Sequence, residues 1–97
     1  MYSVLWEFAA VKDFVKIGRA TLLLKQPHLR SQWRNSLVGP LTVDLLRAFG
    51  EATDYRDHLQ RKSEAPEMIR CYDQICWEIE LELLMTLRRL RRRQTVH

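Results

Sequence analysis

Five arginines close to the C-terminus form the strongest chemical signal in the sequence. They are Arg88, Arg89, Arg91, Arg92 and Arg93. Guanidinium groups bind phosphate oxygens in a bidentate manner, and several together release condensed counterions from nucleic acid. No aromatic residue lies among them to stack on bases, so such binding would be insensitive to base sequence and sensitive to salt. The run is also typical of a helix C-terminus, where cations favour the helix dipole, and of a localisation signal.

A second set of basic residues lies in the first third of the chain. It comprises Lys12, Lys16, Arg19, Arg30 and Arg34. The first three are spaced at i, i+4 and i+7 and would form one narrow stripe on a helix. This stripe would extend a phosphate-binding surface, or it is a solvated face, or it pairs with Glu78, Glu80 and Glu82.

Charge is distributed unevenly along the chain, whose net charge is +4. Residues 1–50 carry seven basic and three acidic side chains, residues 51–87 carry four and nine, and residues 88–97 carry five and none. These blocks can neutralise one another within one chain or between chains. The total charge is therefore weak evidence for an acidic partner.

No catalytic or metal-binding constellation assembles from the sequence. Asp54 and His58 are spaced at i, i+4, but one such pair is far short of a metal site. Cys71 and Cys76 would lie about 140° apart around a helix, so we expect them to be buried thiols, neither paired nor ligating metal. We predict a protein that is not an enzyme, with no catalytic residue, no metal, no cofactor and no small-molecule substrate.

Two short segments are similar to motifs of known families. The segment from Leu46 to Glu51 resembles the core of the death-motif helices that lie in the groove of apoptosis regulators, although Thr53 replaces the final apolar anchor. The segment from Arg34 to Val38 is similar to the Arg-Asn-x-Leu-Val-His signature of HEPN-type helical ribonucleases. That resemblance implies at most an inactive relative, because Gly39 occupies the position of the catalytic His and leaves no general base.

Three breakers divide the chain into four segments with helical periodicity. They are Pro27, the Gly39-Pro40 pair, and the stretch ending at Pro66. The predicted helices run over Ser3–Lys25, Pro27–Val38, Leu41–Lys62 and Glu64–Arg92. The expected fold is all-α, a small bundle of three long helices and one short helix that is completed by oligomerisation. Residues 1–92 would form one domain, and residues 93–97 a basic tail.

The inner faces of the two longest predicted helices follow from their apolar spacing. The third helix would bury Leu41, Leu45, Phe49, Ala52 and Leu59. Gly50 in that helix costs about 1 kcal/mol against Ala unless another backbone packs there. The fourth helix would bury Met68, Tyr72, Ile75, Ile79, Leu83 and Leu90.

The fourth helix carries a second apolar stripe, nearly opposite the first: Trp77, Leu81 and Leu84. A helix on one side of a small bundle needs only one stripe. We therefore expect these three residues, together with Trp6, to meet another chain; alternatively, the first helix covers them.

The leading functional hypothesis is a scaffold, adaptor or regulatory accessory protein that self-associates or docks on a helical partner. The alternative is an accessory subunit that binds RNA or DNA without sequence preference, through the basic stripe and the arginine run. No bilayer-spanning run or secretory leader is predicted, so we expect a cytoplasmic or nuclear protein.

Overall fold

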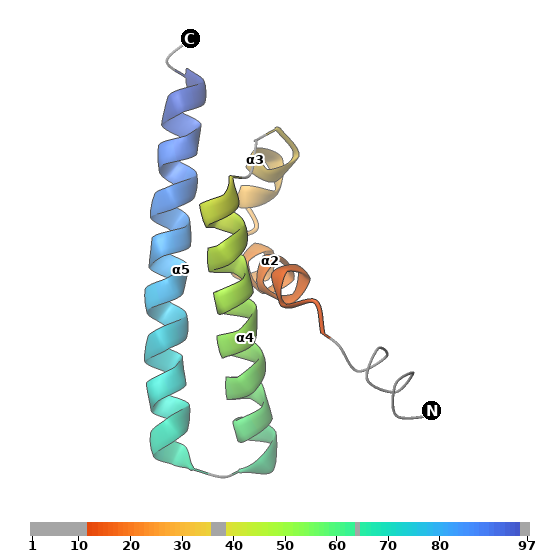
Figure 1. The fold of residues 1–97 in the computed structure, drawn as a ribbon, viewed down its shortest axis with the longest axis vertical. Coiled ribbons are helices and arrows are strands. Elements are labelled where there is room, and N and C mark those ends of the chain that lie inside the picture. Colours follow the sequence, from red (N-terminus) through yellow and green to blue (C-terminus); the bar gives the residue numbers. More distant parts are fainter. Residues whose placement is uncertain (1–11, 36–38, 64, 96–97) are drawn as a thin grey trace, which may run out of the picture.

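The computed structural model describes residues 12–35, 39–63 and 65–95, and every regular element within them is a helix. In chain order these are α2 (Phe14–Lys25), α3 (Leu29–Asn35), α4 (Pro40–Lys62) and α5 (Pro66–Thr95). α4 and α5 form an antiparallel hairpin, α2 packs across α4, and α3 lies near the start of α4 (Figure 1). The predicted all-α fold is confirmed for the described residues.

α2 begins later than its apolar pattern predicts. The side chain of Asp13 accepts a hydrogen bond from the backbone N–H of Lys16 at 3.1 Å, which is the geometry of a helix N-cap. The predicted helix from Ser3 is therefore wrong at residues 12 and 13, which are not helical. Residues 1–11 lie outside the described residues.

The breakers mark the ends of α4 and α5 as predicted, with small shifts. Pro40 occupies the first turn of α4, where its missing N–H leaves no bond unmade. α4 ends at Lys62, and Ser63 takes a left-handed conformation with φ of 52°. α5 starts at Pro66 and continues to Thr95, three residues past the predicted end at Arg92.

The crossing of α2 over α4 depends on two glycines that face each other. A Cβ atom added to Gly18 would overlap the carbonyl oxygen of Leu46 and lie 3.1 Å from the backbone nitrogen of Gly50. A Cβ added to Gly50 would in turn overlap the carbonyl oxygen of Phe14 and lie 3.0 Å from the nitrogen of Gly18. The two helix backbones therefore touch, and neither position has room for a side chain.

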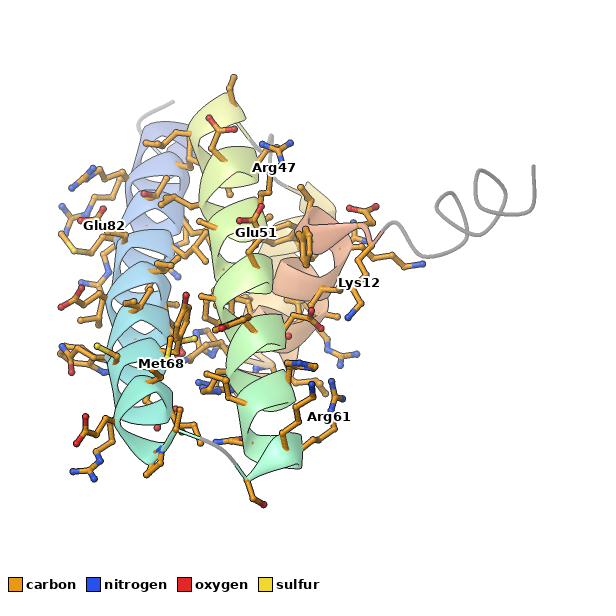
Figure 2. All side chains as sticks on the ribbon, turned by 60° about the horizontal axis from the view of Figure 1, so that its bottom comes forward. Lys12, Arg47, Glu51, Arg61, Met68 and Glu82 are labelled. Atoms are coloured by element: carbon orange, nitrogen blue, oxygen red, sulfur yellow. The ribbon has the colours of Figure 1, made fainter. Side chains whose placement is uncertain are left out.

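The core lies where α2, α4 and α5 meet. Its largest fully buried apolar side chains are Phe49, Leu22, Leu46, Leu83 and Leu87. Burying each contributes about 1.5–3 kcal/mol. Leu29 from α3 belongs to the same cluster, and charged side chains such as Arg61 and Glu82 project from the outer surface of the hairpin (Figure 2).

Three residues predicted to lie in the core are exposed: Met68, Ile75 and Leu41. α2 crosses α4 at Gly50 and reaches α5 at the level of Glu80, so it does not cover Met68 and Ile75 further toward the hairpin turn. Leu41 instead lines an open cavity at the start of α4. The other predicted inner residues of α4 and α5 are buried or half-buried.

We predict that Gly18→Ala and Gly50→Ala each lower the free energy of unfolding by about 3 kcal/mol, because a Cβ forces two backbones apart. Helix propensity alone predicts the opposite effect, because replacing Gly by Ala within a helix would raise the free energy of unfolding by about 1 kcal/mol. Gly39→Ala is the control: nothing lies within 4 Å of its added Cβ, and we expect a change within about 1 kcal/mol. Urea unfolding followed by circular dichroism measures all three, and a stabilised Gly50→Ala variant would contradict the close approach.

Buried threonines provide a second matched pair. The hydroxyl of Thr53 donates to the carbonyl of Phe49 at 2.9 Å, whereas the buried hydroxyl of Thr86 has no partner. Thr86→Val should therefore raise the free energy of unfolding by about 1 kcal/mol and Thr53→Val should lower it by a similar amount. The same unfolding measurement decides this; equal effects of one sign would show that hydrogen bonding does not distinguish the two sites.

Candidate functional site

The face of α5 that points away from the core carries a row of exposed apolar side chains. Trp77, Leu81 and Met85, spaced four residues apart, are 56%, 40% and 49% exposed, respectively. They lie one turn apart along one side of the helix. We call these three residues the outer stripe.

The two other residues predicted for this interface are Leu84 and Trp6. Leu84 is half-buried and packs against the core cluster, so it borders the outer stripe rather than belonging to it. Trp6 lies outside the described residues. Met85, which the sequence pattern missed, continues the stripe by a turn because it follows Leu81 at i+4.

A second exposed apolar surface lies on the opposite flank of α5. It is a groove of about 520 Å³ whose lining includes Phe14, Ala48, Tyr55, Tyr72 and Ile75. The rings of Tyr55 and Tyr72 pack together, with centroids 4.8 Å apart and planes tilted by 52°. This groove is a competing docking surface.

The basic residues predicted to contact phosphate come from α2, α3 and α5 and from the segment just before α2. Lys12 pairs with Asp54 at 2.9 Å, rather than with the acids of α5. Lys16 and Arg19 are exposed on α2, Arg30 on α3, and Arg88, Arg89, Arg91 and Arg92 on α5. The side chains of Arg34 and Arg93 lie outside the described residues.

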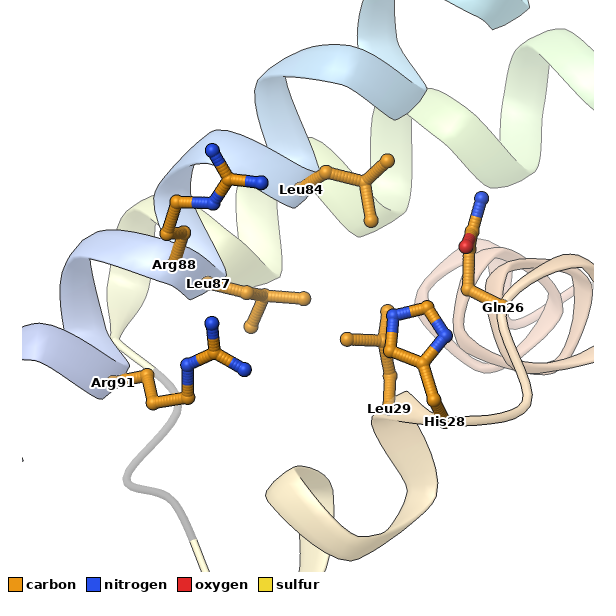
Figure 3. A pocket seen from close by; sticks show the side chains of 7 residues that line it. All are labelled: Gln26, His28, Leu29, Leu84, Leu87, Arg88 and Arg91. Carbon is orange, nitrogen blue, oxygen red and sulfur yellow. The ribbon is translucent and has the colours of Figure 1, made fainter.

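Two of the α5 arginines line a small pocket with residues from the α2–α3 corner. The pocket has a volume of about 220 Å³. Its lining comprises Gln26, His28, Leu29, Leu84, Leu87, Arg88 and Arg91. Arg88 and Arg91 extend from α5 on one side, and Gln26, His28 and Leu29 lie opposite (Figure 3). We call this the cationic pocket.

Sequence reasoning did not find the cationic pocket. His28 lies about 60 residues before the arginines, and only the turn at Gln26 brings it near α5. Gln26 donates from its side-chain amide to Glu80 at 3.2 Å, and Lys25 donates to the same carboxylate at 3.1 Å. These bonds hold the α2–α3 corner against α5, and no local sequence signal encodes them.

Of the two cysteines, only Cys76 is buried as predicted; Cys71 is exposed. Cys71 is on the solvent side of α5 because it lies about 140° from Cys76 around the helix. Burial raises the pKa of the Cys76 thiol above 9.0, although the positive charges of Arg56 and Lys25 oppose the shift. Neither cysteine is paired.

We expect a thiol reagent at pH 8 to modify Cys71 in the folded protein and to modify Cys76 at least about 100-fold more slowly, because Cys76 reacts only on unfolding. The Cys76 thiol ionises at lower pH in the unfolded chain than in the folded one. Its contribution to the free energy of unfolding is therefore complete below the ordinary pKa of a thiol and is lost as the pH rises toward the raised pKa of the folded state. Mass spectrometry after timed labelling tests the first statement; equal labelling rates would contradict the buried position.

Three findings concern functional class. The described residues contain no group of three or more His, Cys, Asp or Glu side chains that could hold a metal ion. In the same part of the chain, no helix combines the length and apolar character needed to cross a membrane. The chain matches no protein-family model, no curated protein and no solved structure.

Proposed function

We propose that this chain is a non-enzymatic helical interaction protein, a scaffold or adaptor, that self-associates through the outer stripe of α5. The observation that carries the proposal is the exposure of Trp77, a residue that is 56% exposed and lies in line with Leu81 and Met85. Large apolar side chains gathered on one exposed face are typical of association surfaces. Tryptophan is among the residues that dominate the binding energy of such surfaces.

The position of the outer stripe favours a second copy of the chain as its partner. α5 runs from Pro66 to Thr95, so its midpoint falls between Glu80 and Leu81. The stripe spans residues 77–85 and is centred on Leu81. A two-fold dimer uses the same patch on both subunits. Antiparallel pairing of two α5 helices about their midpoints would therefore lay each stripe on the other.

Charge along α5 supports the same arrangement. The helix is acidic from Asp73 to Glu82 and basic from Arg88 onward. Parallel pairing would place the arginine runs of the two helices side by side, whereas antiparallel pairing separates them. Complementary charge sets the orientation of a complex more than its affinity. The charges along α5 therefore favour antiparallel pairing but do not make the dimer strong.

The energetic gain is modest. Each side chain of the stripe is already about half buried, so covering the rest contributes roughly 1 kcal/mol per residue and roughly 6 kcal/mol for the six residues of a dimer. Association also costs free energy in lost translational and rotational freedom. The dimer is therefore expected to be weak and concentration-dependent.

The alternative function, nucleic-acid binding by a basic surface, has less support. Lys12 is engaged with Asp54. Arg89 lines a different cavity from Arg88 and Arg91, together with Pro40 and Thr86. A phosphate backbone would need cations spaced along one continuous path.

Light scattering over a range of concentrations tests the proposal. We expect the molar mass to rise from the 11.6 kDa of one chain toward twice that value as concentration increases. Leu81→Glu should raise the dimer dissociation constant by about 100-fold, because a tenfold loss occurs at each of two equivalent sites. Trp77→Ala should act in the same direction.

Two variants provide the controls. Leu24→Glu makes the same change at a leucine of α2 that is 74% exposed, and it should leave dimerisation unchanged. Ile75→Glu makes a similar change in the competing groove. A chain that stays monomeric at high micromolar concentration would overturn the proposal, and so would loss of the dimer in Ile75→Glu but not in Leu81→Glu.

A further inference from the structure

The cationic pocket concentrates positive charge that the described residues do not neutralise. Arg88 and Arg91 are spaced at i, i+3 on α5, where like charges repel. Neither takes part in an ion pair within the described part of the chain, whereas Lys12, Lys25, Arg47 and Arg56 all do. An anion placed between the two guanidinium groups would therefore relieve a repulsion as well as gain two partners.

The acidic residue beside this corner is already engaged. Glu80 accepts hydrogen bonds from both Lys25 and Gln26, and its side chain is only 13% exposed. It is therefore held by the α2–α3 corner rather than by the arginines. The imidazole of His28, opposite them, can donate an N–H to an anion whether it is neutral or protonated.

Apart from Gln26, the rest of the lining is apolar and determines what kind of anion fits. Leu29 and Leu87 are buried core residues, and Leu84 packs against the same cluster. The pocket of about 220 Å³ corresponds to the volume of about seven water molecules. It has room for one tetrahedral or planar anionic group and a short apolar stem, and it is smaller than the 300–1,000 Å³ of typical drug-sized sites.

Two guanidinium groups favour a phosphate monoester over a diester. A monoester is largely dianionic near pH 7, with three strong acceptor oxygens, whereas a diester carries a single charge. A monoester also has one substituent and can enter a pocket end-on, whereas a diester continues in two directions. Arg89 does not extend the pocket, because it lines a separate cavity at the start of α4.

We propose that the cationic pocket binds the terminal phosphate of a small phosphomonoester, with Arg88 and Arg91 holding its oxygens and its apolar stem lying over Leu29, Leu84 and Leu87. His28 donates to the same phosphate from the opposite wall. The pocket is formed within one chain, so this inference goes beyond self-association and does not depend on it.

The test uses the full chain labelled with ¹⁵N and titrated with phenyl phosphate at pH 7. We expect saturable shifts of the side-chain Nε–Hε signals of Arg88 and Arg91, with a dissociation constant of about 1 mM or below. Dimethyl phosphate, a diester probe, should bind at least about tenfold more weakly, because it offers one charge rather than two. The same spectra report whether the chain is folded.

A matched set of single substitutions separates a site from a general charge effect. Arg88→Gln and Arg91→Gln should each raise the dissociation constant for phenyl phosphate at least about tenfold. Arg89→Gln removes the same charge from the adjacent position and should change it less than about threefold. Equal weakening in Arg89→Gln, equal binding of the diester, or no saturation by 20 mM phenyl phosphate (roughly twenty times the expected constant) would each overturn the proposal.

Discussion

The contact between Gly18 and Gly50 is the constraint on which the rest of the structure depends. Because neither residue has a side chain, the backbones of α2 and α4 meet directly. Leu22, one turn further along α2, can then reach the core and become fully buried. The same crossing directs the C-terminal end of α2 toward α5, where Lys25 and Gln26 bind Glu80. A side chain at either glycine would separate the helices and loosen all of these contacts together.

The position of α2 also determines what stays uncovered on α5. α4 and α2 cover one side of that helix, around Cys76, Leu83 and Leu87. The outer stripe lies on the opposite side, and no other described helix reaches it, so Trp77 remains largely exposed. A helix with two apolar faces inside a small hairpin fold has to leave one of them in solvent or share it with another molecule.

The sequence predicts the helices much better than it predicts the surfaces they create. Proline and glycine mark local chain geometry, so Pro40 and Pro66 locate helix starts to within two residues. The sequence also indicates that another backbone could pack at Gly50, although it does not identify Gly18 as the partner. Which apolar residues are buried depends on where α2 crosses, and for this reason Ile75 and Met68 are exposed. The cationic pocket depends on a contact between segments that are distant in the chain, so periodicity carries no information about it.

The arginines near the C-terminus show why a charge run in a helix is a poor guide to one binding surface. Successive residues point about 100° apart, so neighbours in sequence face different environments. Arg88 and Arg91 line the pocket beside His28, whereas Arg89 lies beside the start of α4. These arginines carry the same charge, but they lie in different surroundings. Selectivity among anions of equal charge would arise from the apolar floor of Leu29 and Leu87 beneath two of them, because bulk positive charge distinguishes anions only by their charge.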